Sequence, residues 1–229
     1  LKYGDIFVAS NINYTGTNES TLTLKAHRSV VFANGYGGNS GSSFSTVGGI
    51  HSTNAALNVV LWSRAGDTAT EANLYRRGSV WVPVGASIQT NGGDITIGGG
   101  LNPLTGYSYH DGRGNTVEGN AITRGVSING SLDAQGGNIS IKGEGHITTA
   151  SRGVSISGSV STKDSGNISI DGISHTGSDG IALGDTAVTG TTGVINIQNG
   201  ILTLNGTKGT GANGINFSTA GSAINITGS

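Results

Sequence analysis

Hydrophobic residues along this chain form short runs that alternate with polar residues, and turns rich in glycine, asparagine, serine and threonine separate the runs. The string GNISI, at 137–141 and again at 166–170, shows the pattern. Its isoleucines fall on one face of a strand and its polar residues on the other. No apolar run keeps a helical period for long enough to form a helix. The chain is therefore predicted to be all-β.

Similar strings recur along the chain in a fixed order. One family of strands starts at residues 93, 137, 166, 193 and 222, and reads GDITI, GNISI, GNISI, GVINI and SAINI. A second family starts at residues 125, 153 and 180, and reads GVSI, GVSI and GIAL. A third short strand contains one aliphatic residue in each copy: Ile88, Leu132, Val160 and Val188. A fourth is suggested by Ile147, Ile173 and Ile201.

Each unit of about 28 residues thus contains three or four short strands in the same order. Equivalent strands of successive units can stack about 4.8 Å apart, so that their aliphatic side chains form continuous interior ladders. This predicts a right-handed parallel β-helix. A two-sheet sandwich also has many short strands, but these do not repeat in a fixed order at one period. A β-propeller needs a longer repeat of about 40 residues, which is absent from the sequence.

The regularity is uneven along the predicted single domain, which covers residues 1–229. Coils of about 28 residues are expected in 123–229, and less regular coils in 1–122. The step between the strands at 93 and 137 is 44 residues, and the surplus falls in 99–120. We interpret 99–120 as a loop ejected from one coil.

Composition narrows the classes of function. The 229 residues include 42 glycines but two prolines and no cysteine, which leaves neither disulfides nor thiolate metal sites. The formal net charge is -1 and no basic stripe is present, so we expect no nucleic-acid partner. The apolar runs are too short to cross a bilayer, so we expect no membrane insertion. No cofactor or metal motif is found, and none is expected.

The opening run LKYGDIFVASNINYTGTNESTLTLKAHRSVVFAN resembles the repeating units of filamentous-haemagglutinin-like exoproteins of the two-partner-secretion adhesin family. LWSRAGD, SIQTNGGDITIGGG and GVSINGSLDAQGGNISIKGEG resemble the longer internal repeats of the same family. The resemblance implies a secreted or cell-surface protein of a Gram-negative bacterium, exported by an outer-membrane transporter. It also implies a role in adhesion, biofilm formation, virulence or contact-dependent competition. Asn102-Pro103-Leu104 is only superficially like the family's export motif, so we assign the chain to the repeat region.

Polysaccharide lyases and glycoside hydrolases also use β-helices, and they need acids or cations clustered on one face of neighbouring coils. Asp94 aligns with asparagines at 138 and 167, so no acidic ladder is expected. Four further acids are better explained as turn residues: Asp164, Asp171, Asp179 and Asp185. The histidines lack metal-binding spacing and are expected to be single surface residues: His27, His51, His110, His146 and His175. We therefore predict no catalytic residues and a chain that is not an enzyme.

Aromatic residues suggest where a ligand would bind, because most of them precede residue 112. A mixed aromatic and polar patch is suited to stacking on sugars or contacting a protein. Its predicted members are Tyr75, Arg76, Arg77, Tyr107, Tyr109, His110, Asp111 and Arg113. Trp62 and Trp81 are expected to fill wider coils instead.

The chain also contains Asn-x-Ser/Thr triplets, the acceptor sequence for N-linked glycans. They occur at Asn13, Asn18, Asn129, Asn138, Asn167, Asn205, Asn216 and Asn225. In a chain this rich in asparagine, serine and threonine, chance alone can supply such triplets.

Two hypotheses of different classes follow. The first is a structural and adhesive shaft, with a host or bacterial surface glycan or protein as its receptor. The second is a carbohydrate-binding or polysaccharide-degrading β-helix module, which requires an open groove lined by acids and aromatics.

Overall fold

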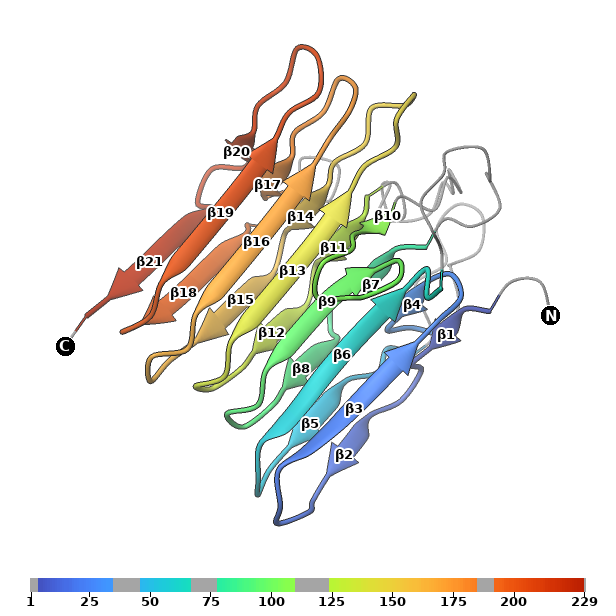
Figure 1. Cartoon of the computed structure of the whole chain (residues 1–229). Helices are drawn as coiled ribbons and strands as arrows, with labels where there is room; N and C mark the ends of the chain where they lie inside the picture. Colours follow the sequence, from blue (N-terminus) through green and yellow to red (C-terminus); the bar gives the residue numbers. More distant parts are fainter. Residues whose placement is uncertain (1–3, 35–45, 67–77, 110–123, 185–191, 229) are drawn as a thin grey trace.

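A computed structural model describes residues 4–34, 46–66, 78–109, 124–184 and 192–228 of the chain. Within these ranges the regular secondary structure consists of β-strands alone, and the strands belong to three sheets. All pairings between the strands are parallel, and strands of the inner coils pair with their equivalents in the coils before and after them (Figure 1). The chain is a parallel β-helix, which confirms the predicted fold class.

The chain passes through the three sheets in turn. The first sheet consists of β1 (Ile6–Phe7), β4 (Val30–Val31), β7 (Val80–Val82), β11 (Val126–Ile128), β14 (Val154–Ile156), β17 (Ile181–Leu183) and β20 (Ile215–Phe217). The second consists of β2 (Ile12–Tyr14), β5 (Ile50–Ser52), β8 (Ser87–Gln89), β12 (Ser131–Asp133), β15 (Ser159–Thr162), β18 (Val194–Gln198) and β21 (Ala223–Thr227). The third consists of β3 (Ser20–Lys25), β6 (Leu57–Ser63), β9 (Ile95–Gly99), β13 (Ile139–Glu144), β16 (Ile168–Ile173) and β19 (Leu202–Thr207), and β10 (Ser108–Tyr109) pairs with β13.

The interior is a set of aliphatic ladders. In β13, Ile139 and Ile141 are buried whereas Ser140 between them is partly exposed, as the alternation predicts. Ile139 pairs with Ile95 in the coil before and with Ile168 in the coil after. Each fully buried side chain of this size contributes about 1.5–3 kcal/mol relative to an exposed one. The repeated isoleucines therefore stabilise each coil against the next.

Coil length differs along the chain. Val80, Val126, Val154 and Ile181 occupy equivalent places in the first sheet, so the successive steps are 46, 28 and 27 residues. The step from Ile181 to Ile215 lengthens again to 34 residues. The surplus residues lie between the strands that stack from coil to coil, and those strands keep their register throughout.

One predicted alignment is wrong. Sequence similarity groups GVINI at 193–197 with GNISI at 166–170, but β18 pairs with β15 in the second sheet, and β19 pairs with β16. Ten residues separate β17 from β18, whereas two separate β14 from β15. This longer connection places the similar string in a different sheet. Val188, predicted for the third strand family, lies outside the described residues.

The tryptophans do not fill the main interior. Trp81 lies between the inward-facing Val80 and Val82, and it is buried in a separate cluster with Val31 and Ala33 on the other side of the first sheet. Trp62 lies between Leu61 and Ser63 in β6, both buried, and is itself only partly buried. Their place in the alternation therefore puts both rings outside the main aliphatic core, which corrects the prediction.

Close backbone contacts mark the corner between the third and first sheets. A Cβ atom added to Gly143 would lie 2.3 Å from the carbonyl oxygen of Gly153, and one added to Gly153 would lie 2.6 Å from that of Gly143. The loop 144–152 lies between these two glycines. The same contact recurs one coil later between Gly172 and Gly180. These glycines are needed because no side chain fits where the two backbones meet.

Candidate binding surface on the third sheet

The predicted patch is only partly within the described residues. Tyr107 and Tyr109 are described, whereas Tyr75, Arg76, Arg77, His110, Asp111 and Arg113 lie outside the described residues. Both tyrosines lie in the first half of the predicted loop 99–120. This half is not ejected from the coil, as the sequence predicted, but packs back on the third sheet. After β9 the chain turns through 100–107 and returns as β10, where Ser108 and Tyr109 pair with Gly143 and Glu144.

Short contacts hold the segment 100–107 against β6 and β9. The Trp62 indole N–H donates to the Gly100 carbonyl at 2.8 Å, and the Gly99 N–H donates to the Gly106 carbonyl at 3.0 Å. A Cβ atom on Gly98 would lie 2.0 Å from the Pro103 carbonyl oxygen, so the turn needs glycine beneath it. The segment is thus packed on the outside of the third sheet.

Tyr107 connects this segment to coils further along the chain. Its hydroxyl donates to Asp171 Oδ2 at 2.6 Å, and Lys142 Nζ lies 3.1 Å from the same oxygen. Burial raises the pKa of Tyr107 above its ordinary value, and the hydrogen bond to Asp171 and the negative charges of Asp171 and Glu144 raise this pKa further. The phenol therefore stays protonated near neutral pH and acts as a hydrogen-bond donor.

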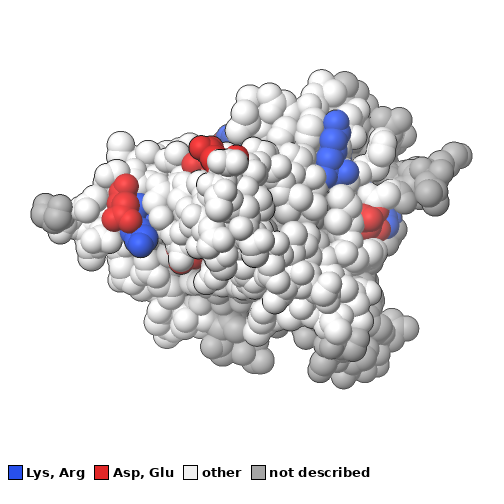
Figure 2. All heavy atoms as spheres, turned by 90° about the horizontal axis from the view of Figure 1, so that it is seen from below, with Lys and Arg blue, Asp and Glu red and all other residues white. Residues whose placement is uncertain are grey.

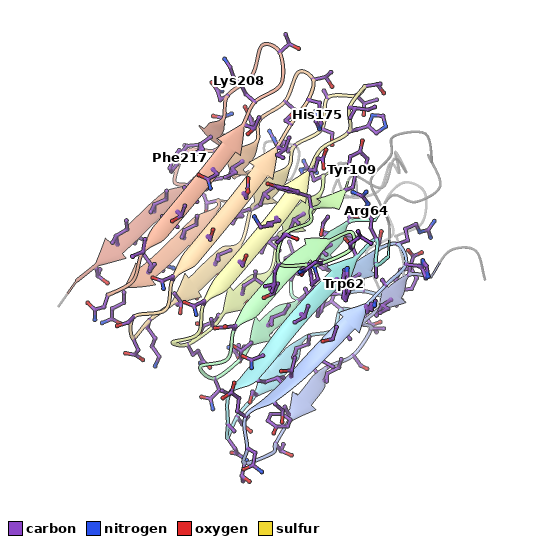
Figure 3. All side chains as sticks on the ribbon, viewed as in Figure 1. Trp62, Arg64, Tyr109, His175, Lys208 and Phe217 are labelled. Atoms are coloured by element: carbon purple, nitrogen blue, oxygen red, sulfur yellow. The ribbon has the colours of Figure 1, made fainter. Side chains whose placement is uncertain are left out.

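Three aromatic rings on this surface are covered by cations of the chain itself. Lys25 Nζ lies 4.1 Å from the centre of the Trp62 ring, and Lys142 Nζ lies 5.3 Å from that of Tyr107. The Arg64 guanidinium carbon lies 5.0 Å from the centre of the Tyr109 ring, and Figure 3 labels both residues. A sugar stacks on an open ring face. One face of each of these three rings is already occupied.

Two histidines extend the surface. The rings of Tyr109 and His146 have their centres 6.3 Å apart. His146 is buried, which corrects its prediction as a surface residue, and its Nδ1 accepts the backbone N–H groups of Thr148 and Thr149 at 3.1 and 3.2 Å. Accepting at Nδ1 requires the neutral tautomer with hydrogen on Nε2. His175 Nε2 lies 2.8 Å from Glu144 Oε1.

The contacts of Glu144 with His175 and of Asp171 with Tyr107 were missed by sequence reasoning. The spacing contained a partial signal: Glu144 pairs with Ile173, two residues before His175, and Lys142 pairs with Asp171. Once the register of β13 and β16 is known, these charged residues fall on neighbouring strands. The position of Tyr107 has no such signal, because it depends on how the turn 100–107 folds.

Asp94 and the asparagines aligned with it accept backbone N–H groups of the next coil. Asp94 Oδ1 accepts the Asn138 N–H at 2.7 Å, and Asn138 Oδ1 accepts the Asn167 N–H at 3.0 Å. Asn167 Oδ1 in turn accepts the N–H of Ile201 at 2.8 Å. We call Asn58, Asp94, Asn138 and Asn167 the asparagine ladder, because Asp94 N–H likewise donates to Asn58 Oδ1 at 2.8 Å. As predicted, the counterparts of Asp94 are asparagines.

The remaining acids do not converge on one place. Asp171 lies within β16, which corrects its prediction as a turn residue. Asp179 is buried and accepts from the Asn216 side chain at 2.9 Å, whereas Asp164 is exposed; Asp185 lies outside the described residues. Within the described ranges, no group of three or more histidines and acids is arranged to hold a metal ion. Figure 2 shows charged side chains as a few separate spots on a face that is otherwise uncharged.

Within the described ranges, no helix long and apolar enough to cross a membrane is found. Comparison of the chain with protein-family models, curated proteins and solved structures gives no match. The strand pairing therefore establishes the fold, and the family resemblance rests on the sequence strings alone.

Proposed function

We propose that this chain is a shaft segment of a large bacterial surface or secreted exoprotein, which holds its length and contributes to adhesion. The observation that supports this most is the continuity of the coils: all three sheets run through the described structure from its first coil to its last. Every coil stacks on the next through the same aliphatic ladders. Each coil is therefore stabilised by its neighbours, and the stack as a whole forms a stiff rod.

The aromatic surface supports the same proposal. Trp62, Tyr107 and Tyr109 contact cations or acids from other coils and so connect distant parts of the chain. Contacts of this kind stabilise the stack, and they do not require a ligand. From the sequence resemblance we further propose export by an outer-membrane transporter of a Gram-negative bacterium, with a surface glycan or protein as receptor.

The strand register supplies a sharp experiment. Val154 and Ile181 occupy equivalent places, so deleting 154–180 removes one coil and joins Gly153 to Ile181 in register. A shaft tolerates this deletion: the variant keeps its β-type circular dichroism, and small-angle scattering shows a rod shorter by about 4.8 Å. The control deletes 154–167, which removes β14 and β15 and joins β13 to β16 of the same sheet; the order of the sheets is then broken, and the following coils should not fold.

Adhesion is then measured with the parent chain and the one-coil deletion. Beads coated with the parent chain and with the one-coil deletion should adhere equally to cells or surfaces that the parent binds. Loss of adhesion on removal of one coil would instead locate a discrete binding site in 154–180. Release of reducing sugar from any polysaccharide by the parent chain would refute the shaft proposal in favour of the enzyme.

A further inference from the structure

The loop 144–152 is organised around a buried histidine. His146 is 6% exposed. Its Nδ1 accepts the backbone N–H of Thr148 at 3.1 Å and that of Thr149 at 3.2 Å, and the Thr148 hydroxyl lies 3.0 Å from the same nitrogen. A single ring nitrogen therefore fixes the path of the backbone as the loop leaves β13.

Backbone contacts hold both ends of this loop without the histidine. The Gly145 N–H donates to the Ile173 carbonyl at 2.7 Å, and the Arg152 carbonyl accepts the N–H of Gly125 at 3.2 Å. A Cβ atom on Gly145 would lie 2.1 Å from the Ser151 carbonyl oxygen, so the two ends of the loop touch. The part of the loop between these ends can therefore leave its place without separating β13 from β14.

The closed loop accommodates only the neutral form of His146. A protonated imidazole carries hydrogen on both ring nitrogens, so Nδ1 then donates instead of accepting. The Thr148 hydroxyl can rotate and accept from it, but the backbone N–H groups of Thr148 and Thr149 cannot. Both amides would lose their acceptor and face another N–H, which destabilises the closed loop relative to one that is open to water.

The charged groups next to this loop do not favour a new positive charge on His146. Among the described residues they are Glu144 and Arg152 in the same coil, Arg64 and Tyr109 in earlier coils, and His175 and Asp179 in the next coil. Both acids already have partners: Glu144 Oε1 lies 2.8 Å from His175 Nε2, and Asp179 Oδ2 lies 3.7 Å from Arg152 Nε. The Tyr109 ring beside His146 has the Arg64 guanidinium over it.

His175 responds to acid in the opposite sense. Its Nε2 already contacts a carboxylate, and a protonated Nε2 donates to that carboxylate, so protonation strengthens the contact with Glu144. Figure 3 labels His175 and Tyr109. His175 therefore provides a matched control for His146 at the same corner of the stack.

We propose that the loop 144–152 is a pH-sensitive device, closed while His146 is neutral and opened when His146 is protonated, with the coils on both sides unchanged. The closed loop binds fewer protons than the open one, so it is stable at high pH and is lost as the pH falls. The change is expected below pH about 6.5, the ordinary histidine value. This device does not depend on whether the rod is adhesive.

Amide hydrogen exchange, followed by NMR in the whole chain and corrected for intrinsic rates, tests the proposal. Between about pH 8 and about pH 5, which spans the histidine range, the protection of the Thr148 and Thr149 amides should fall by roughly tenfold or more. The Ile139 amide, which donates to Asn167 in the sheet, should keep its protection. Unchanged protection of the threonine amides would overturn the proposal. An equal loss at Ile139 would also overturn it, because the whole coil would then be unfolding.

Two substitutions identify the group that titrates. In His146→Asn a side-chain oxygen replaces Nδ1 as the acceptor and does not titrate, so the threonine amides should stay protected at both pH values. In His175→Gln the loop should open as it does in the parent. Opening that persists in the first variant, or that disappears in the second, would overturn the proposal.

The nitrogen chemical shifts of the His146 ring in the parent give a readout that does not depend on any variant. They should show Nδ1 without hydrogen above the transition and with hydrogen below it. Nδ1 should gain its proton over the same pH range in which the Thr148 and Thr149 amides lose protection. Two separate pH ranges would overturn the proposal.

Discussion

Replacing Tyr107 by phenylalanine tests whether the segment 100–107 is tied to the coils beyond it. The substitution removes one hydroxyl group and keeps the ring beside Lys142. The lost hydrogen bond runs to a carboxylate at 2.6 Å, and bonds of that class contribute about 1.5–3 kcal/mol. Asp171 keeps Lys142 at 3.1 Å, and both side chains are partly exposed to water, so we expect a loss of about 1 kcal/mol.

A double-mutant cycle isolates this contact. The free energies of unfolding of the parent, Tyr107→Phe, Asp171→Asn and the double variant are measured by denaturant titration near neutral pH. The Lys142–Asp171 ion pair is lost in both variants that contain Asp171→Asn, so it cancels from the coupling energy. A coupling energy near zero would refute the contact between Tyr107 and Asp171.

The pH dependence gives a second, independent readout. The folded chain raises the pKa of Tyr107 above its usual value of about 10, so the native state holds this proton more tightly than the unfolded state. The stabilisation is therefore fully present below pH 10 and is lost as the pH rises above that value. Between pH 9 and 11 the parent should lose stability faster than Tyr107→Phe does. Parallel curves would contradict the raised pKa.

Three other substitutions test the stack itself. Gly143→Ala forces a Cβ atom to within 2.3 Å of a carbonyl oxygen and should cost about 1–3 kcal/mol or more in denaturant titrations, whereas Gly4→Ala, with its nearest atom at 3.8 Å, should be tolerated. Ile168→Ala should cost about 2–5 kcal/mol by the same measurement, because it opens a cavity in a fully buried ladder. Asn138→Ala should cost about 1 kcal/mol and speed hydrogen exchange at the Asn167 amide; unchanged exchange there would contradict the asparagine ladder.

The fold could be predicted from the sequence because each coil repeats the same local solution. Isoleucine alternates with a polar residue in β13 and β16, and the spacing of 29 positions from Asn138 to Asn167 places equivalent side chains on top of one another. A solenoid needs little more information than this, since its contacts are between nearest neighbours. Sequence similarity failed where a turn changed length, as it did before β18.

The candidate surface was less predictable for a physical reason. Tyr107 and Asp171 are 64 residues apart, and two intervening coils of unequal length separate them. No local pattern fixes which turn packs across which strand. Tyr107 and Tyr109 suggested a sugar platform in the sequence, but Lys142 and Arg64 each cover one face of these rings, and only the three-dimensional register shows this.

The close contact between Gly143 and Gly153 separates the length of the chain from the geometry of the rod. Because the backbone meets at these two residues, Ile141 and Val154 keep their places however many residues lie between the glycines. We expect that the exposed tip of this loop, residues 148–150, can be exchanged for a foreign peptide without changing the spacing of the coils, whereas Gly145, His146 and Ser151 beside it are buried. The equivalent loop between Gly172 and Gly180 lies one coil further on, so two different peptides grafted into these loops would be displayed side by side, at a separation fixed by the hydrogen bonds of the sheets.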